Sequence, residues 1–545
     1  CGVANERGRS VSGLESIVLT AENLPEGDLF TGFAFSGSDF IVGPEGFGAY
    51  TRAGGAIAHH DDGCYLLVRR EGAEWVMGSD FKGNCKVFYY QDGDRWAVGN
   101  SIADLVSAVR ARGWTITVQP HLLSTWEMRI PIWDMCVSYE TMVKEIRLLP
   151  RWSVLRASPG GIREEIALSL DATESYDAYV EALRTYVETW MGRIGTIAAD
   201  DEAHITVDVT GGIDSRAVLT LFLGARQHLG IPFDGAIRFK SDTVERRADD
   251  LKVAQNLADH YNFTLNRALH VPTAVRRLTG GQQFARWESF AFGSYRPVYE
   301  PGSVTDLHAL PFGGQGGEGH RQSYASFEDP EALFRRERKR YGDDDKFDQV
   351  QHAIETSLAV IARQSPRTPP LLAHFQEFRD RHHAGLNPQY RLRSVPLTGR
   401  HLHEASRHLS PEFLLRGQTL RDLHAVTAPG LLAIPYDKPG KAATPEMLRD
   451  LIKPLDVSPK LGKVYGLGSA QTPPEDGRSG NFIEIFQGTY RRARRRLPEG
   501  VLKTDTLKAA DNAWKNLPRE RGGPRAAALR LAHCVMFADF LISGD

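Results

Sequence analysis

The residues with the clearest chemical potential lie between Val207 and Leu219, in the stretch VDVTGGIDSRAVL. The apolar residues before the glycines predict a buried strand, and the periodic segment that begins near Ser215 predicts a helix. Between them, Gly211 and Gly212 let backbone N–H groups turn toward an anion, because no Cβ stands in the way. The start of a helix points its positive end at the same place. The stretch therefore predicts a phosphate site.

The polar side chains of this loop extend that prediction. Thr210 and Ser215 add hydroxyl donors, and Asp214 offers a hard oxygen ligand for Mg²⁺. The alternative is an ordinary glycine turn between a strand and a helix. Two interpretations of Arg216 stand side by side: a contact with pyrophosphate or the acyl substrate, and a surface or ion-pair role. The residues expected to contact ATP or pyrophosphate here are Val209, Thr210, Gly211, Gly212, Asp214, Ser215 and Arg216.

This loop is not a Walker loop, since G-x-x-x-x-G-K-[ST] is absent from it. It closely resembles the S-G-G-x-D-S pyrophosphate loop of the ATP pyrophosphatases, which cleave ATP between the α- and β-phosphates. Over nearly its whole length the chain resembles the asparagine synthetase family. Further similar segments are GCYLLVRREGAEWVMGSDFKGNCKVFYY from Gly63, IRLLPRWSVL from Ile146, the segment 242–260, and Ser394–Leu397.

A second glycine loop, Gly313–Glu318, follows the predicted strand 307–312. It resembles the family's S-G-E-G-A-D-E loop, which implies that Gly314, Gln315 and Gly316 contact ATP and that Glu318 is a Mg²⁺ ligand together with Asp214. Phe239, at the end of another predicted strand, is also expected at ATP. A flexible surface loop is the alternative.

Gln315 stands where the family has a glutamate that handles the nucleophile's proton. An amide is no general base at neutral pH, so ammonia-dependent asparagine formation is disfavoured. Relatives that close β-lactam rings also replace this glutamate. The resemblance therefore points to an amine carried by a substrate.

A lysine in the C-terminal region of the family meets the pyrophosphate and the transition state. Its ammonium would offset the negative charge that develops there. Lys438 in IPYDKPGK is the first candidate and Lys441 the second, with a surface position as the alternative for either.

Cys1 invites a further interpretation. An N-terminal cysteine carries its own base, the α-amino group, and class II amidotransferases expose Cys-Gly in this way. However, the segment that would hold the glutamine-gripping arginine and the N-G-E-I-Y-N strand is missing, and Asp61 or Asp62 is only a weak match for the amine-binding aspartate. We expect a degenerate glutaminase domain, with Cys1 catalytic only if that domain is active.

The elements that must position these residues predict two domains. Residues 1–168 show short strands and turns, including a hairpin at Gln91–Asp94, and predict a β-sandwich. In residues 169–545 strands first alternate with helices, which implies a parallel sheet with its ligand at the strand ends, and the remainder is mainly helical. The resemblance implies an N-terminal-nucleophile type sandwich followed by an ATP-pyrophosphatase synthetase domain. The segment 465–481 predicts an exposed, mobile loop.

Bulk composition sets limits on partners and location. The 545 residues are 41% hydrophobic and 25% charged with a net charge of −2, which gives no reason to expect nucleic acid or an anionic membrane. No uninterrupted apolar run reaches membrane-spanning length. Five scattered cysteines without metal-ligand spacing are typical of reduced cytoplasmic thiols. Two basic runs, 335–340 and 490–496, are solvated helix faces or docking sites for an acidic partner.

Together these features predict an AMP-forming carbon–nitrogen ligase that uses ATP and Mg²⁺. It would adenylate a small-molecule or peptide carboxylate and pass the acyl group to an amine, in natural-product or peptide biosynthesis, like β-lactam synthetases and lasso-peptide cyclases. The alternatives are a glutamine-dependent amidotransferase that uses Cys1 and an inactive binding or regulatory paralogue. Retention of both Gly211-Gly212 and Asp214-Ser215 argues against the inactive paralogue.

Overall fold

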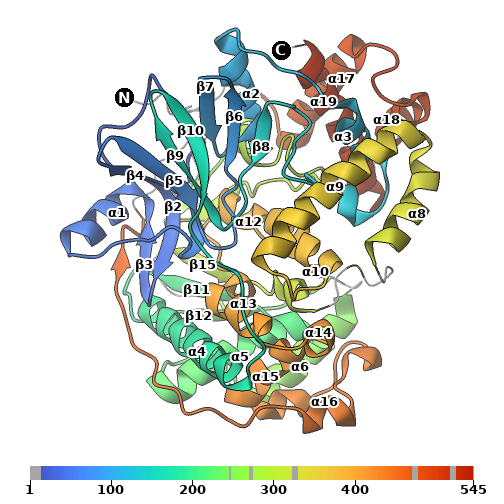
Figure 1. Ribbon diagram of the computed structural model, residues 1–545. Helices are drawn as coiled ribbons and strands as arrows, with labels where there is room; N and C mark the ends of the chain where they lie inside the picture. Colours follow the sequence, from blue (N-terminus) through green and yellow to red (C-terminus); the bar gives the residue numbers. More distant parts are fainter. Residues whose placement is uncertain are drawn as a thin grey trace.

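The structure, a computed structural model, describes residues 14–244, 247–268, 274–321, 324, 329–468, 477–515 and 523–543. Cys1 lies outside these residues. The fold is mixed α/β with several sheets and a helical C-terminal part. In Figure 1 the N-terminal strands, coloured blue to cyan, lie above the green strands of a parallel sheet, and yellow, orange and red helices cover the other side of the molecule.

Two sheets are built mainly from the first 168 residues, as predicted. The four-stranded sheet has the order β1-β7-β6-β8, and the seven-stranded sheet has the order β10-β9-β5-β4-β2-β3-β16. Their strands are β1 Val18–Thr20, β2 Leu29–Ser36, β3 Asp39–Val42, β4 Asp62–Glu71, β5 Glu74–Ser79, β6 Phe88–Asp92, β7 Arg95–Gly99, β8 Ile146–Leu148, β9 Ser153–Ser158, β10 Gly161–Ile166 and β16 Val464–Tyr465. The helices of this region are α1 Gly43–Arg52, α2 Ile102–Ala111 and α3 Pro120–Ser124.

Alternation along the strands decides which face each side chain covers. On β2, Phe33 and Phe35 enter the main core, whereas Ala34 between them joins a second cluster with Tyr50 of α1. The predicted hairpin forms between β6 and β7, and Gly93 supplies the left-handed backbone of its turn with φ of 59°. Strand pairing in both sheets is therefore set by a two-residue period and by turn chemistry.

The strand β16 comes from the C-terminal part of the chain and corrects one prediction. It runs parallel to β3, with Val464 opposite Phe40 and Tyr465 opposite Ile41. The loop expected over 465–481 is thus ordered at its first residue, and residues 469–476 of it lie outside the described residues. The seven-stranded sheet takes strands from both sides of the expected boundary at residues 168 and 169.

The second half opens with a parallel sheet of order β12-β11-β15. Two further parallel bridges, Phe239 to Leu265 and Phe312 to Ser394, extend it on both sides. In chain order the five segments lie as 3-2-1-4-5, so the direction of winding reverses between β11 and β15. In doubly wound sheets, ligands bind beyond the carboxyl ends of the strands at such a reversal.

Helices flank this sheet and build the rest of the chain. The elements around the sheet are α4 Tyr176–Ala198, β11 His204–Asp208, α5 Ile213–Leu229, β12 Ile237–Lys240, α6 Ala248–Tyr261, β13 Val275–Arg277, α7 Gly280–Phe290, β14 Val304–Asp306 and β15 Ala309–Phe312. The helical part contains α8 Pro330–Tyr341, α9 Asp344–Gln364, α10 Pro370–His374, a π-helical turn Phe375–Asp380, α11 Arg381–His383, α12 Leu386–Tyr390, α13 Arg400–Arg407, α14 Pro411–Leu415, α15 Gln418–Thr427, α16 Pro445–Arg449, α17 Phe482–Arg496, α18 Thr504–Lys515 and α19 Gly523–Ser543.

Helix α19 has the length and apolarity of a membrane-spanning helix, which no single uninterrupted run in the sequence indicated. It packs against α17 and α18, and most of its apolar stretch is buried inside the molecule. His533 lies in its middle, between the rings of Trp126, Trp287 and Phe292. These contacts are those of a core helix in a globular protein.

The two basic runs lie on helices, as predicted, and several of their side chains are paired. On α8, Arg338 contacts Asp348 and Asp344. On α17, Arg494 lies 3.2 Å from Asp511, and Arg496 lies 2.6 Å from the buried Asp539. These pairs favour the solvated-face interpretation over docking.

A buried ionic cluster joins the two halves. Arg151 of the first half lies 3.0 Å from Glu377 on the π-helical turn, and Arg381 lies 3.2 Å from the same carboxylate. Arg381 also donates to the backbone oxygens of Gly83 and Leu149. Ionised groups of this kind are tolerated in a core only when they are paired and hydrogen-bonded, so the two halves fold as partners.

Candidate active site

The glycine loop leaves β11 at its carboxyl end and enters α5. Thr210 and Ser215 close the loop through hydroxyls 2.9 Å apart, and the Thr210 N–H donates to Ser215 Oγ at 3.2 Å. Gly212 precedes the first helical residue and makes no side-chain cap. The first N–H groups of a 17-residue helix therefore face outward at the point where the sheet reverses.

The second glycine loop follows β15 and touches the first. A Cβ on Gly314 would lie 2.9 Å from the backbone of Asp214 and Ser215, and one on Gly317 would overlap the Asp214 side chain. Gly316 has φ of 94° and packs on Thr398. The loops approach so closely that larger residues would push them apart.

One cavity of about 790 Å³ lies at the junction of the two loops. That volume is within the usual range for small-molecule sites. Its lining residues are Asp208, Thr210, Gly212, Asp214, Ser215, Arg238, Lys240, Ser241, Asp242, Thr243, Arg247, Asn266, Gly314, Gln315, Gly316, Glu318, Asp380 and His383. The structure thus brings together eight of the residues predicted for ATP or metal binding.

Charge is unevenly distributed over this lining. The cations Arg238 and Lys240 belong to β12, and Arg247 follows it. Two carboxylates lie among these cations, since Asp208 is in register with Lys240 and Asp242 lies 3.7 Å from Arg247. Asp214, Glu318 and Asp380 lie close to one another and form an acidic end, where burial raises the pKa of Asp214. Burial and the neighbouring Asp380 carboxylate raise the pKa of Glu318. The acidic end is therefore the part of the cavity where a cationic ligand gains most.

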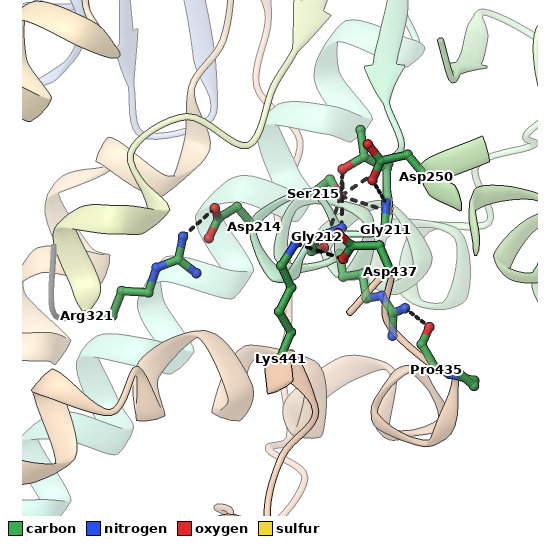
Figure 2. A network of polar contacts seen from close by, with 11 residues as sticks. Gly211, Gly212, Asp214, Ser215, Asp250, Arg321, Pro435, Asp437 and Lys441 are labelled. Atoms are coloured by element: carbon green, nitrogen blue, oxygen red, sulfur yellow. Dashed lines mark hydrogen bonds and ion pairs between the residues drawn. The ribbon is translucent and has the colours of Figure 1, made fainter. Parts of the chain in front are cut away.

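Figure 2 shows the contacts of Asp214. Its Oδ2 lies 2.8 Å from Nη2 of Arg321, a residue that the sequence analysis did not single out. Its Oδ1 is buried and accepts no hydrogen bond from the described residues. Within those residues, no group of three or more His, Cys, Asp or Glu side chains is arranged to hold a metal ion by itself.

Gly211 lies at the loop but does not line the cavity. Its N–H donates to Asp250 of α6 at 3.0 Å, and its oxygen accepts from the Asp437 N–H at 3.4 Å. A Cβ at this glycine would lie 2.6 Å from Cβ of Asp437. Gly211 therefore supports the loop by letting the segment after α15 pack directly on it.

The two candidate lysines do not line the cavity, contrary to expectation. Lys438 is exposed, whereas Lys441 pairs with Asp437 through its Nζ at 2.7 Å (Figure 2). Lys441 is still close enough that its charge opposes the raised pKa of Asp214. Lys438 is exposed to solvent, whereas Lys441 points toward the loop (Figure 2).

Arg216 does not line the cavity, which corrects a second expectation. The side chain is fully buried, and its guanidinium donates to the backbone oxygens of Leu431, Ile434 and Pro435. It also lies 3.7 Å from the centre of the Tyr436 ring. One residue after Ser215 the helix has turned by about 100°, so Arg216 faces away from the cavity.

Val209 and Phe239 are likewise buried and absent from the cavity lining. Phe239 packs among Phe222, Phe233 and Phe263 in the core. The Val209 N–H donates to the oxygen of Lys240 at 2.8 Å. The side chains of these two residues hold the strand ends together and face the core, and the expected ATP contact of Val209 and Phe239 stays a prediction.

Gln315 belongs to a short polar chain at the cavity wall. Its Oε1 accepts from Nη2 of Arg393 at 3.2 Å, and the same nitrogen lies 2.6 Å from Asp208. The arginine charge is already balanced by one carboxylate, and the neutral amide completes its hydrogen bonds. A glutamate at this position would place a second negative charge beside the same arginine.

Of the residues discussed for a glutaminase, Cys1 lies outside the described residues. Asp62 is engaged elsewhere, since it lies 2.6 Å from Arg193 and accepts from the Arg400 N–H at 2.8 Å. Asp61 is substantially buried, and burial raises its pKa to about 6. Asp62 therefore joins the two halves and is not available to hold a free amine.

Sequence reasoning missed several lining residues. Asp208 and Lys240 end predicted strands, and the strand-end rule for parallel sheets would have found them. Asp380 and His383 had no local signal, because they come from the helical part more than 160 residues after the first loop.

No family model matches the chain, and a search of the curated proteins finds no significant match.

Proposed function

We propose that the chain is an ATP-dependent, AMP-forming amide-bond ligase, which adenylates a substrate carboxylate and transfers the acyl group to an amine. One observation carries this proposal: two glycine loops meet beyond the strand ends at the reversal of a parallel sheet, over one large polar cavity. The finer fold we propose is an ATP-pyrophosphatase domain behind a degenerate N-terminal-nucleophile sandwich. Both follow from the resemblance of the loops to those of the asparagine synthetase family.

The first loop is suited to a polyphosphate. The Thr210 and Ser215 hydroxyls and the N-terminus of α5 supply donors in one place. Arg238 and Lys240 on the neighbouring strand add positive charge. These groups would hold ATP with its α-phosphorus open to attack by a substrate carboxylate. The bond to pyrophosphate breaks as the new P–O bond forms, and the carboxyl oxygen becomes part of a good leaving group.

Asp214 and Glu318 fit a magnesium ion. Mg²⁺ in nucleotide sites commonly takes one or two carboxylates and completes its shell with phosphates and water. The buried Oδ1 of Asp214 accepts no hydrogen bond from the described residues, which leaves it available as a ligand. When bound, the ion would neutralise phosphate charge. Asp214 and Glu318 lie beside each other and both have a raised pKa, so their ionised forms are disfavoured without a cation between them.

The second half-reaction is attack by an amine on the acyl-adenylate. Gln315, bound to Arg393, accepts hydrogen bonds but takes up no proton. This favours an amine that is delivered unprotonated as part of a bound substrate over free ammonia. We therefore propose small-molecule or peptide substrates for both the acid and the amine, and biosynthesis of a natural product or peptide as the setting.

Exchange of labelled pyrophosphate into ATP, screened over a panel of carboxylic acids, tests the adenylation step. We expect acid-dependent exchange in the wild type and its loss in Asp214→Ala. Asp201→Ala is the matched control, because Asp201 is exposed and lies outside the cavity lining. A wild-type chain that neither binds ATP nor supports exchange with any acid would contradict the proposal, and would favour a binding or regulatory protein.

A further inference from the structure

A hydrogen-bonded chain that the two glycine loops do not include reaches the cavity at His383. This residue ends α11, directly after the π-helical turn, and lines the cavity with Asp380. Its Nδ1 lies 2.7 Å from the hydroxyl of Tyr295. Nη1 of Arg379 donates to the same hydroxyl at 2.9 Å, and Arg379 faces the buried Asp134 at 3.7 Å.

The hydrogen bonds assign the tautomer of His383. Tyr295 is buried, and burial raises its pKa, so the hydroxyl keeps its proton at neutral pH. A buried hydroxyl proton needs an acceptor. Arg379 only donates, and within the described residues His383 Nδ1 is the acceptor in contact. Tyr295 therefore donates to Nδ1, and the ring proton of His383 sits on Nε2.

The imidazole is a neutral donor. Burial and the Arg379 charge lower the pKa of His383 to about 4; Asp134 opposes this shift and Arg530 adds to it. The ring edge opposite Tyr295 carries Nε2, for which the described residues provide no partner. That nitrogen is also not a buried one, so its N–H is open to the cavity.

The surroundings indicate what this donor is for. Asp214, Glu318 and Asp380 line the same end of the cavity, where Arg321 pairs with Asp214 and Lys82 lies 2.6 Å from Asp380. A neutral N–H among them attracts an oxygen without adding a charge that would pair permanently with these acids. Neutral histidine donors of this kind serve as electrophiles in other enzymes.

We infer that His383 Nε2–H is the hydrogen-bond donor to the acyl oxygen of the substrate, with Tyr295 and Arg379 as positioning residues. This inference rests on the proposed ligase function. The amine nitrogen forms a bond to the acyl carbon while the carbonyl electrons move to the oxygen that His383 holds. Collapse of this oxyanion breaks the carbon–oxygen bond to AMP, and the proton of the amine passes to water. Donors aimed at such an oxyanion act mainly in the transition state.

The test uses the full chain with an acid identified by pyrophosphate exchange, and measures kcat of amide formation. His383→Ala should lower kcat on the order of 10²- to 10³-fold with an unchanged KM for ATP. His383→Gln should recover most of the activity, because its amide N–H reaches the position of Nε2. Tyr295→Phe should fall between them, since it frees the tautomer. His352→Ala, an exposed histidine on α9, is the control.

A pH–rate profile separates a donor from a base. The ring can donate from Nε2 in both protonation states. Any acid limb in the wild-type profile should therefore also be present in His383→Gln. The inference is overturned if His383→Ala equals the wild type. It is also overturned if His383→Gln is as inactive as His383→Ala and the wild type shows an acid limb. If His383→Ala does not fold, His383→Gln is compared with Tyr295→Phe. Higher activity in His383→Gln supports the inference, and lower activity overturns it. Absence of exchange in the wild type would instead defeat the ligase proposal.

Discussion

Two groups of acidic side chains, one buried and one lining the cavity, differ in how their charges are balanced. Behind the cavity, Glu377 sits between Arg151 and Arg381 with contacts of 3.0 and 3.2 Å. In the cavity, Asp214 and Glu318 have raised pKa values because burial is not fully compensated. A protein neutralises a buried charge where it needs rigidity. An imbalance that persists at a cavity indicates a place where a ligand completes the electrostatics.

The largest effect should come from breaking the compensated group. Glu377→Gln leaves two buried arginines without their shared partner, so we expect a loss of about 3–5 kcal/mol in the free energy of unfolding. Urea denaturation measures it, with Glu331→Gln on the exposed face of α8 as the control. If both variants unfold at the same urea concentration as the wild type, the cluster does not hold the halves together.

The group in the cavity should respond in the reverse manner. Asp214→Asn keeps the shape of the side chain but removes its charge, so pyrophosphate exchange should fall on the order of 10²- to 10³-fold, or about 3–4 kcal/mol in activation free energy. Its free energy of unfolding should stay the same or rise. A clear destabilisation with retained exchange would place Asp214 among the structural charges.

A third kind of buried carboxylate sharpens the comparison. Asp422 accepts from the Tyr179 hydroxyl at 2.5 Å and from the Ile452 N–H at 3.1 Å, and burial raises its pKa from 3.8 to about 6. Because the folded state binds the extra proton, stability should fall as pH rises from about 4 to 6, by roughly 3 kcal/mol for a shift of this size. Asp422→Asn should flatten the dependence measured by urea denaturation at a series of pH values. A slope unchanged in this variant would assign the pH dependence to other groups.

The smallest effect should come from ligand binding to the wild type. Mg²⁺ with ATP at a hundredfold excess over Kd should stabilise the folded state by about 2.7 kcal/mol. Thermal unfolding with and without EDTA measures the metal contribution. Asp214→Asn should show little of this shift, whereas Glu377→Gln, once corrected for its lower starting point, should keep it. Equal shifts in both variants would remove the distinction between the two acidic groups.

The sequence predicted the glycine loops because all their chemistry lies within a few adjacent residues. It also predicted the strand β11 and the helix α5 on either side of the first loop, since hydrophobic periodicity is a local signal. The neighbours of the loops were not predictable in this way. Arg321, Arg393 and His383 reach the site from separate segments whose local patterns show nothing unusual. The prediction of a ligand contact for Arg216 failed because consecutive residues on a helix point about 100° apart, so Arg216 does not share the face of Ser215.

The pairing of β16 with β3 joins residues that are far apart along the chain: the Lys463 N–H donates to Asp39, 424 positions earlier. During synthesis at about 5–20 residues per second, the outer side of β3 therefore waits roughly 20–80 s for its partner. An unpaired strand edge invites association with other chains for as long as it is open. Because this contact joins residues so far apart in the sequence, completion of the seven-stranded sheet is one of the last events in folding. A chaperone that shields this edge would raise the yield of protein without touching the cavity.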